Sequence, residues 1–252
     1  MLKIVTYNLR WDAPEDGVHR FSNRKEEVMD RIKEEMPDVI AFQEMRADMQ
    51  EWMEPRMEEY FYVGHGRDAD FNGESIPIAF RKDKFKMRAF ECFWLSPTPE
   101  IPGSRYAEQG RSLRICNVLT LYSVEDKKSF RVYNVHLDHV SAVARSKGIQ
   151  LVVDYAEKLN EVELLPSVIL GDLNAFPEWD DLNPVTKNPD YVDVTKDIPV
   201  TFHGFFVTAD KIDYIFMSKK LECKECYIWE DREGRPILSD HHPVCALAEF
   251  VD

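Results

Sequence analysis

Six short segments of the sequence place acidic, histidine or asparagine side chains beside apolar runs. They are residues 7–9, 43–44, 134–139, 171–174, 211–214 and 239–243. Hydrolysis of a phosphate ester needs a hard cation, a polarised water molecule and groups that stabilise the developing charge. Because the six segments follow one another along the whole chain, they predict strand ends that converge on one metal-assisted hydrolytic site.

Five of these side chains are candidates for binding a metal ion and activating water. Glu44 ends an apolar run and is the first candidate metal ligand, with Asn8 and Asp240 beside it. Asp172 and Asn174 stand at alternate positions of an extended segment, so both point to one side. Asp172 can then accept a proton from water while Asn174 holds that water or a phosphate oxygen. Each motif alone also fits a solvated strand end or an Asx-turn, and only the combination indicates a site.

Histidines supply groups that could face a phosphate oxygen. A histidine can be cationic near neutral pH when a carboxylate supports it, and Asp213 is the candidate partner of His241. His136 and His139 could act in the same way from the opposite wall. Zinc is the alternative metal, although the sequence has no His-x-x-x-His pair. The zinc ligands would be His136, Asp138, His139, Asp240, His241 and His242.

Two strand–helix–strand units must position these side chains. The sequence pattern predicts strands at residues 2–7, 38–43, 130–135 and 166–170, and helices at 22–36 and 149–159. The units look like an internal duplication, in which Asn8 corresponds to His136 and Glu44 corresponds, within one residue, to Asp172. A crossover returns the chain to its starting edge, so both strands of a unit end at the same rim, where ligands bind in open α/β sheets.

The rest of the chain adds strands and loops to these two units. Further strands are predicted at residues 76–81, 87–95, 112–122, 212–217 and 244–250. Proline-containing and acidic stretches at 95–103 and 171–199 predict loops. Neither stretch is repetitive enough to link two domains, so we predict a single domain over residues 1–252.

Composition limits the class of protein and of substrate. Of the 252 residues, 44% are hydrophobic and 31% are charged, which is typical of a globular chain. The net charge of −14 disfavours a long nucleic-acid substrate, because duplex DNA is drawn by its phosphates to basic surfaces. A phosphate-bearing ligand would need a locally basic cleft or a metal ion.

Cysteine usage and the absence of targeting signals bear on the compartment. The five cysteines lack framework spacing, which predicts a reducing compartment. Cys223 and Cys226 form a single Cys-x-x-Cys, which fits ordinary strand residues better than a structural zinc site with four ligands. No signal peptide opens the sequence, and no run approaches the ~20 apolar residues of a membrane span. We therefore expect a cytoplasmic protein, unless an export signal has been removed from it.

Taken together, the motifs resemble those of the endonuclease/exonuclease/phosphatase superfamily, which includes pancreatic deoxyribonuclease, inositol polyphosphate 5-phosphatases, neutral sphingomyelinases and deadenylases. The matching motifs cover nearly the full chain in order, at residues 6–8, 43–44, 136–137, 171–174, 212–215 and 239–241. Each motif is weak alone, but the set is specific. The resemblance implies a four-layer α/β sandwich with two central mixed β-sheets flanked by helices, the DNase I-like fold.

The resemblance also implies roles for the residues that would handle metal and water. Glu44 would bind Mg²⁺, for which Mn²⁺ could substitute, and Asn8 and Asp240 would lie close to the ion. Asp172 would orient or deprotonate the attacking water, and Asn174 would position the phosphate.

Three further residues would act on the phosphate itself. His136 and His241 would contact the scissile phosphate, and Asp213 would support His241. The expected reaction is in-line attack of water on phosphorus, in which positioning and charge stabilisation do most of the catalysis.

Further similarity is to a little-characterised bacterial branch of the superfamily. Its markers here are residues 8–10, 16–17, 24, 73–74, 93–96, 114 and 201–204. Arg67, Glu74, Arg114 and His203 are the candidates for binding the leaving group, although Arg67 and Glu74 fit surface loop residues equally well.

Three functions compete on these observations. The leading one is a Mg²⁺-dependent phosphohydrolase, a phosphomonoesterase or phosphodiesterase, that acts on a small phosphorylated molecule such as a sugar phosphate, a headgroup or a short nucleotide. The second is a nuclease or deadenylase-like 3′ exonuclease on single-stranded nucleic acid, which needs a basic, aromatic-lined groove and is disfavoured by the net charge. The third is a non-hydrolytic binding module, which is disfavoured because every matched catalytic position holds a competent residue.

Overall fold

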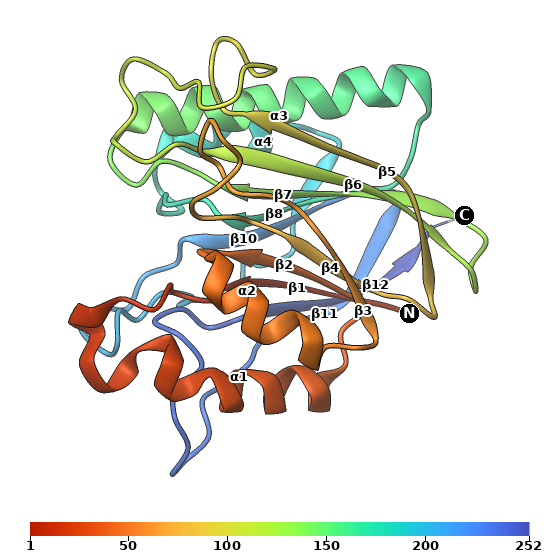
Figure 1. The fold of residues 1–252 in the computed structure, drawn as a ribbon. Coiled ribbons are helices and arrows are strands. Elements are labelled where there is room, and N and C mark those ends of the chain that lie inside the picture. Colours follow the sequence, from red (N-terminus) through yellow and green to blue (C-terminus); the bar gives the residue numbers. More distant parts are fainter. Residues whose placement is uncertain (252) are drawn as a thin grey trace.

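The computed structural model describes residues 1–251, which form two six-stranded β-sheets stacked face to face (Figure 1). Across the first sheet the strands are β11 (Leu221–Ile228), β12 (Val244–Phe250), β1 (Leu2–Asn8), β2 (Val39–Gln43), β4 (Ile78–Arg81) and β3 (Tyr60–Val63). Across the second they are β5 (Phe85–Trp94), β6 (Ile115–Ser123), β7 (Ser129–His136), β8 (Ser167–Asp172), β10 (Asp213–Ser218) and β9 (Tyr191–Asp193).

Helices cover the outer faces of both sheets (Figure 1). α1 (Phe21–Glu35) and α2 (Ala47–Met53) lie on the first sheet, and α3 (Ala142–Val162) lies on the second. The shorter helical segments are η1 (Pro14–His19), η2 (Glu54–Arg56), η3 (Asp180–Leu182) and α4 (Asn183–Thr186). The resulting four layers confirm the predicted α/β sandwich. None of the helices in residues 1–251 is both long enough and apolar enough to span a membrane.

α1 nearly matches the helix predicted at residues 22–36, whereas α3 begins earlier and ends later than the helix predicted at 149–159. α1 turns Val28, Met29 and Ile32 into the core beneath β2, where they join Phe42. The helix stops because its C-cap residue, Met36, adopts a left-handed conformation with φ of 44°, and Pro37 follows. α3 likewise turns an apolar stripe, including Ile149, Val152 and Ala156, toward the second sheet.

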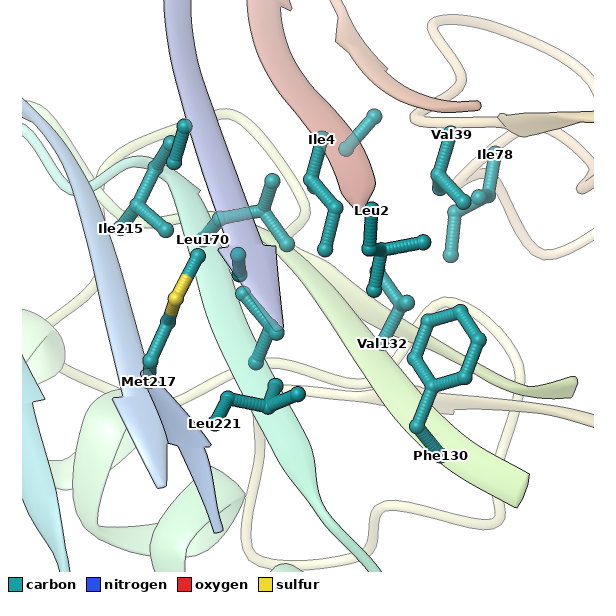
Figure 2. Close-up of a cluster of buried hydrophobic side chains, with 14 of the residues drawn as sticks. Leu2, Ile4, Val39, Ile78, Phe130, Val132, Leu170, Ile215, Met217 and Leu221 are labelled. Carbon is teal, nitrogen blue, oxygen red and sulfur yellow. The ribbon is translucent and has the colours of Figure 1, made fainter. Parts of the chain in front are cut away.

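The two sheets meet through an apolar layer that is buried from both sides. Figure 2 shows side chains from β1 and β4, such as Ile4 and Ile78, facing Val132, Leu170 and Ile215 from the second sheet. Strands buried on both faces read as nearly continuous apolar runs, which is why the sequence predicts them well. This layer leaves the strand ends, rather than the sheet faces, as the place for polar chemistry.

The predicted correspondence between the two strand–helix–strand units is confirmed by the strand pairing. β1 and β2 are parallel, with Asn8 paired to Gln43, and β7 and β8 are parallel, with His136 paired to Asp172. Gly171 allows the second pair to approach closely, because a Cβ atom at this position would lie 1.8 Å from the carbonyl oxygen of Val135. Each unit therefore brings its polar residues to one rim.

Several elements were not predicted from the sequence. β3 has only four residues and α2 only seven, so each is too short for a repeating apolar pattern to stand out in the sequence. Residues 171–199 were predicted to be a loop, but they contain η3, α4 and β9. Residues 95–103 form a loop, as predicted. Cys223 and Cys226 lie on β11 as unpaired thiols.

A buried amide in β7 joins the two sheets just below the rim. The Nδ2 atom of Asn134 donates to the carbonyl oxygens of Phe42 (2.8 Å) and Ile76 (2.9 Å). Phe42 lies in β2 and Ile76 lies just before β4, so both acceptors come from the first sheet or its connections. Its Oδ1 atom accepts a hydrogen bond of 2.8 Å from Gln43 Nε2. Asn134 and Gln43 are both fully buried, so these hydrogen bonds do not compete with water.

We predict that Asn134→Leu destabilises the protein by about 3 kcal/mol, because it strands buried donors and acceptors in both sheets. Urea unfolding followed by circular dichroism measures the change. Asn23→Leu at an exposed position of α1 is the control and should change stability by less than about 0.5 kcal/mol. Equal effects of the two substitutions would show that the amide does not join the sheets.

Candidate active site

A cavity of about 350 Å³ lies at the rim where the strands of both units end. Most of the candidate residues predicted from the sequence line it. These are Glu44, Arg67, Glu74, Arg114, His136, Asp172, Asn174, Asp240 and His241. Two more candidates, Asn8 and Asp213, contact lining side chains from behind. The remaining candidate, His203, is not among the lining residues.

The rim is held in place by backbone geometry and by one buried guanidinium. Glu44 directly follows β2 with φ of 58°, and Asn174 has φ of 49°. A left-handed conformation is unfavourable for glutamate and marks a locally strained position of the kind often found at functional sites. Arg24 of α1 is buried and donates hydrogen bonds to the carbonyl oxygens of Leu9 (2.5 Å) and Leu238 (2.5 Å). It thereby fixes the loop after β1 beside the segment that carries Asp240.

Asn8 connects the two units through its amide. Its Nδ2 atom lies 3.0 Å from Asp172 Oδ2 and 3.3 Å from Glu44 Oε1. Its Oδ1 atom accepts a hydrogen bond of 2.9 Å from the backbone N–H of Arg10. The amide nitrogen, not the oxygen, therefore faces the carboxylates, and only the second lone pair of Oδ1 is left for a metal ion.

The carboxylates of Glu44 and Asp240 fit a hard divalent cation. Among residues 1–251, Glu44 accepts two long hydrogen bonds of 3.3 Å, from Asn8 Nδ2 and from the backbone N–H of Trp11. Asp240 accepts one of 3.2 Å from Ser239 Oγ, and its Oδ2 lies 3.9 Å from Arg10 Nε. Both side chains line the cavity with oxygen atoms that are weakly engaged, which is the donor type that Mg²⁺ takes.

Asp172 has the environment of a general base. Its Oδ1 atom accepts a hydrogen bond of 3.0 Å from the backbone N–H of Asn174. Burial raises the pKa of Asp172 to about 7, and the neighbouring carboxylates of Asp213 and Glu44 act in the same direction, whereas His241 opposes them. A carboxylate with a pKa near neutrality accepts a proton more readily than an ordinary aspartate.

Asp213 and His241 form the predicted carboxylate–histidine pair, with 2.8 Å between Asp213 Oδ2 and His241 Nδ1. Burial by itself would lower the pKa of His241, but Asp213, Asp240 and Asp172 outweigh it and raise the pKa to about 10. His241 is therefore an imidazolium at neutral pH, and its Nε2–H is available to an anion in the cavity.

The opposite wall differs from the sequence expectation. His136 Nε2 lies 3.4 Å from Asp172 Oδ2, and Nδ1 lies 3.5 Å from Glu74 Oε1. Burial and the cation of Arg114 lower the pKa of His136 well below its ordinary value, and they also lower that of His139. Both histidines are therefore neutral at neutral pH rather than cationic, and His136 can donate a hydrogen bond but supplies no charge.

Arginines provide the positive charge on this wall. Arg67 forms an ion pair with Glu74. Arg114 is buried, and its Nη2 atom lies 3.1 Å from His139 Nδ1. The Nε and Nη1 atoms of Arg114 have no hydrogen-bond partner among the described residues. A buried guanidinium with unpaired donors beside a cavity is expected to bind an anion there, because leaving such donors unsatisfied is costly.

The alternative zinc ligands do not gather around one point. Asp138 accepts hydrogen bonds from the backbone N–H groups of Gly110 (3.0 Å), Val140 (2.9 Å) and Ser141 (2.6 Å), so it holds a loop. His241 faces the cavity and Asp213, whereas the ring of His242 packs on His203 at a centroid distance of 4.5 Å. The six-residue zinc site considered from the sequence is therefore not formed.

Several residues that line the cavity have no role predicted from the sequence. They include Arg10, Trp11, Ser112, Phe202 and Ile212. Arg10 was visible as part of the marker at residues 8–10, and its pairing with Asp16 could not be read from the chain alone. Phe202 was visible as part of the marker at residues 201–204, whereas Trp11 carries no local signal, because single aromatic residues usually belong to the core.

Comparison with known proteins places the chain among relatives of the same fold. The family model of the Endonuclease/Exonuclease/phosphatase family matches residues 5–241. The uncharacterized protein L388 of Acanthamoeba polyphaga mimivirus is 27% identical over 169 residues, which cover 63% of this chain and 60% of that protein. The match thus spans about three fifths of that relative's length.

Two solved bacterial structures are similar over their whole length. The endonuclease/exonuclease/phosphatase from Bacteroides vulgatus has a TM-score of 0.92 and 28% identity, with 99% of each chain covered. A mannosyl-6-phosphatase of Bacteroides thetaiotaomicron has a TM-score of 0.90 and 26% identity, with 99% of this chain and 100% of that chain covered.

The stacked mixed sheets, with acidic, amide and histidine side chains at one rim, define a hydrolase of phosphate ester bonds with a DNase I-like fold. The chain belongs to the Endonuclease/Exonuclease/phosphatase family.

We predict that His241 stays protonated across about pH 6 to 8, because its carboxylate neighbours raise its pKa to about 10. In Asp213→Asn the pKa of His241 should fall, since the carboxylate of Asp213 is the largest of the contributions that raise it. The ¹⁵N shifts of the imidazole, followed by NMR across a pH series, report the change. Titration of wild-type His241 at its ordinary pKa would contradict the assignment.

Proposed function

We propose that the protein is a Mg²⁺-dependent phosphohydrolase that cleaves the P–O bond of a small phosphorylated molecule. One observation carries this proposal: the buried guanidinium of Arg114 has unpaired donors beside a cavity that also contains Asp172, whose pKa is near 7. An anion held by Arg114 would lie in the same small cavity as the candidate base and the imidazolium of His241.

The metal would be held by Glu44 and Asp240, with Asn8 beside them. When bound, Mg²⁺ neutralises phosphate oxygens and stabilises the charge that develops on them. Nothing in the donor set demands a softer ion, because oxygen ligands suit Mg²⁺ and Mn²⁺ alike.

The side chains of the cavity would activate the water and bind the phosphate oxygens. Asp172 accepts a proton from the attacking water, whose oxygen forms the new bond to phosphorus while the bond to the leaving oxygen breaks. Asn174 orients that water or a phosphate oxygen. His241, held by Asp213, donates a charged hydrogen bond to a phosphate oxygen, and His136 donates a neutral one.

The size and charge of the cavity favour a small monoester. A volume of about 350 Å³ is at the lower end for ligand pockets and suits a molecule of the size of a sugar phosphate. Arg67 and Arg114 share an ion-pair contact with Glu74, so these three side chains together offer one net positive charge to a phosphate. Glu74 adds an acceptor for sugar hydroxyl groups, and a similar protein is a mannosyl-6-phosphatase. We therefore propose a hexose phosphate or a compound of similar size as the substrate.

A panel of phosphate compounds tests this proposal. Phosphate release should be fastest with hexose phosphates in Mg²⁺. Cleavage of phosphodiesters, measured by the alcohol that leaves, should be slower, and shortening of labelled oligonucleotides should be negligible. EDTA should abolish the activity, and added Mg²⁺ or Mn²⁺ should restore it. Preferential degradation of single-stranded oligonucleotides would instead favour the nuclease alternative, and no turnover with any compound or metal would favour a binding module.

Asp172→Asn should lower kcat by about a thousandfold or more, because the amide cannot accept the proton from water. Substrate affinity should change little, since the amide keeps the shape of the side chain. Stopped assays of phosphate release under saturating substrate measure kcat. Asp154→Asn, at an exposed position of α3, is the control and should retain full activity. An unchanged kcat in Asp172→Asn would remove Asp172 from the mechanism.

Arg114→Met should raise KM and the inhibition constant for inorganic phosphate by roughly tenfold to a hundredfold, the usual worth of charge-assisted hydrogen bonds. Thermal stability of the ligand-free protein should change little, because Nε and Nη1 of Arg114 have no hydrogen-bond partner among the described residues and the ion pair of Nη1 with Glu74 is long, at 3.9 Å. Arg88→Met, at a surface ion pair with Glu163, is the control for removal of an arginine. A large loss of stability without a change in KM would assign Arg114 to the fold instead.

A further inference from the structure

A second cluster of ligand-type side chains lies outside the candidate active site. It consists of His203, Asp231 and His242, which can each offer one ligand atom with all three atoms within 4.8 Å of one another. None of the three lines the catalytic cavity. His242 directly follows His241, and neighbouring residues of an extended segment point to opposite sides, so the two histidines serve different places.

The cluster contains buried polar atoms without partners. His203 is only 4% exposed, and neither Nδ1 nor Nε2 has a hydrogen-bond partner among the described residues. The Oδ2 atom of Asp231 is also buried and unpaired. Ring stacking explains the packing of His203, which lies on Phe206 at a centroid distance of 4.8 Å, but it leaves the nitrogens unsatisfied. Unsatisfied buried polar atoms are rare and call for a missing partner.

Backbone hydrogen bonds hold the three residues together before any ion binds. The N–H of His203 donates to the carbonyl oxygen of Asp240 (2.9 Å), and the N–H of His242 donates to that of Thr201 (2.7 Å). Asp231 is fixed by the backbone N–H of Leu238, which donates to its Oδ1 atom at 2.7 Å. This leaves Oδ2 free to bind. A site that exists in the unbound protein binds a metal ion without a large ordering cost.

We propose that His203, His242 and Asp231 bind a divalent transition-metal ion of the Zn²⁺ class, at a site distinct from the catalytic one. Two imidazoles and one carboxylate are a common ligand set for such ions, and they are poorly suited to Mg²⁺. Asp231 and His242 are partly exposed, so solvent can supply the fourth ligand. A neutral imidazole offers one nitrogen lone pair to a metal ion, and both ring nitrogens of His203 lack a hydrogen-bond partner among the described residues.

The ion would connect His203 to Asp231 and His242, which both lie in the segment between β11 and β12. It would tie the turn after residue 200 to the start of this segment and to the part that carries Asp240 and His241. Phe202 lies in that turn and lines the catalytic cavity. The ion would therefore brace one wall of the active site without contacting the substrate.

Co²⁺ tests the site, because its visible absorption reports the ligand set and geometry independently of catalysis. The full-length protein is first saturated with Mg²⁺ to fill the catalytic oxygen ligands, and Co²⁺ is then titrated. We expect about one equivalent of Co²⁺ to bind with intense absorption typical of four-coordinate cobalt, and Zn²⁺ to displace it. Protein without this absorption under these conditions would overturn the proposal.

Matched variants separate the two sites. His203→Gln and Asp231→Asn should each weaken Co²⁺ binding by more than roughly 100-fold. Loss of a side chain that only supports a metal ligand costs up to about that factor, so a larger loss indicates a direct ligand. His65→Gln should keep the absorption, since His65 stacks on Trp94 away from the cluster. Glu44→Gln, which removes a catalytic metal ligand, should also keep it.

Circular dichroism shows whether each variant is folded. If His203→Gln does not fold, Asp231→Asn alone still tests the site. Absorption that survives in Asp231→Asn but disappears in Glu44→Gln would assign the bound ion to the catalytic site and refute a second one.

Discussion

The hydrogen bond of 2.8 Å from Gln43 to Asn134 ties together the two halves of this protein at the level of its active site. Gln43 ends β2 directly before Glu44, and Asn134 lies two residues before His136 in β7. An apolar layer alone would allow the sheets to slide, because hydrophobic contacts are not directional. Buried hydrogen bonds are directional, so this link fixes how the two strand–helix–strand units face each other and hence the distances across the rim.

The charges at the rim depend on this registration. Asp172 sits close to Asp213 and Glu44, and its raised pKa follows from burial and from their charges. His241 is held cationic by the same acids, whereas His136, only a few ångströms from Asp172, is neutral because it is buried beside Arg114. Two histidines in one cavity thus differ in charge because their neighbours differ. In the proposed reaction, a cation, a neutral donor and a base would act on one phosphate.

Adjacent histidines in the segment 239–243 illustrate how a short motif can serve two places. His241 faces the catalytic cavity, and His242 packs with His203 on the other side. The oxygen-rich side favours a hard ion and the imidazole-rich side a softer one, so the two proposed metal sites differ in chemistry although they share a segment. This sharing also means that the position of Asp240 and His241 depends on packing outside the cavity.

Local sequence determined the strands that carry the site, the helices α1 and α3, and the correspondence between the two units. Apolar runs and 3.6-residue stripes are properties of neighbouring residues, and the motif order led to the family. The tertiary structure alone decided the neutrality of His136, the orientation of the Asn8 amide and the place of His203 beside Asp231. The reason is physical: pKa values and ligand sets depend on burial and on side chains distant in sequence, which no local pattern records.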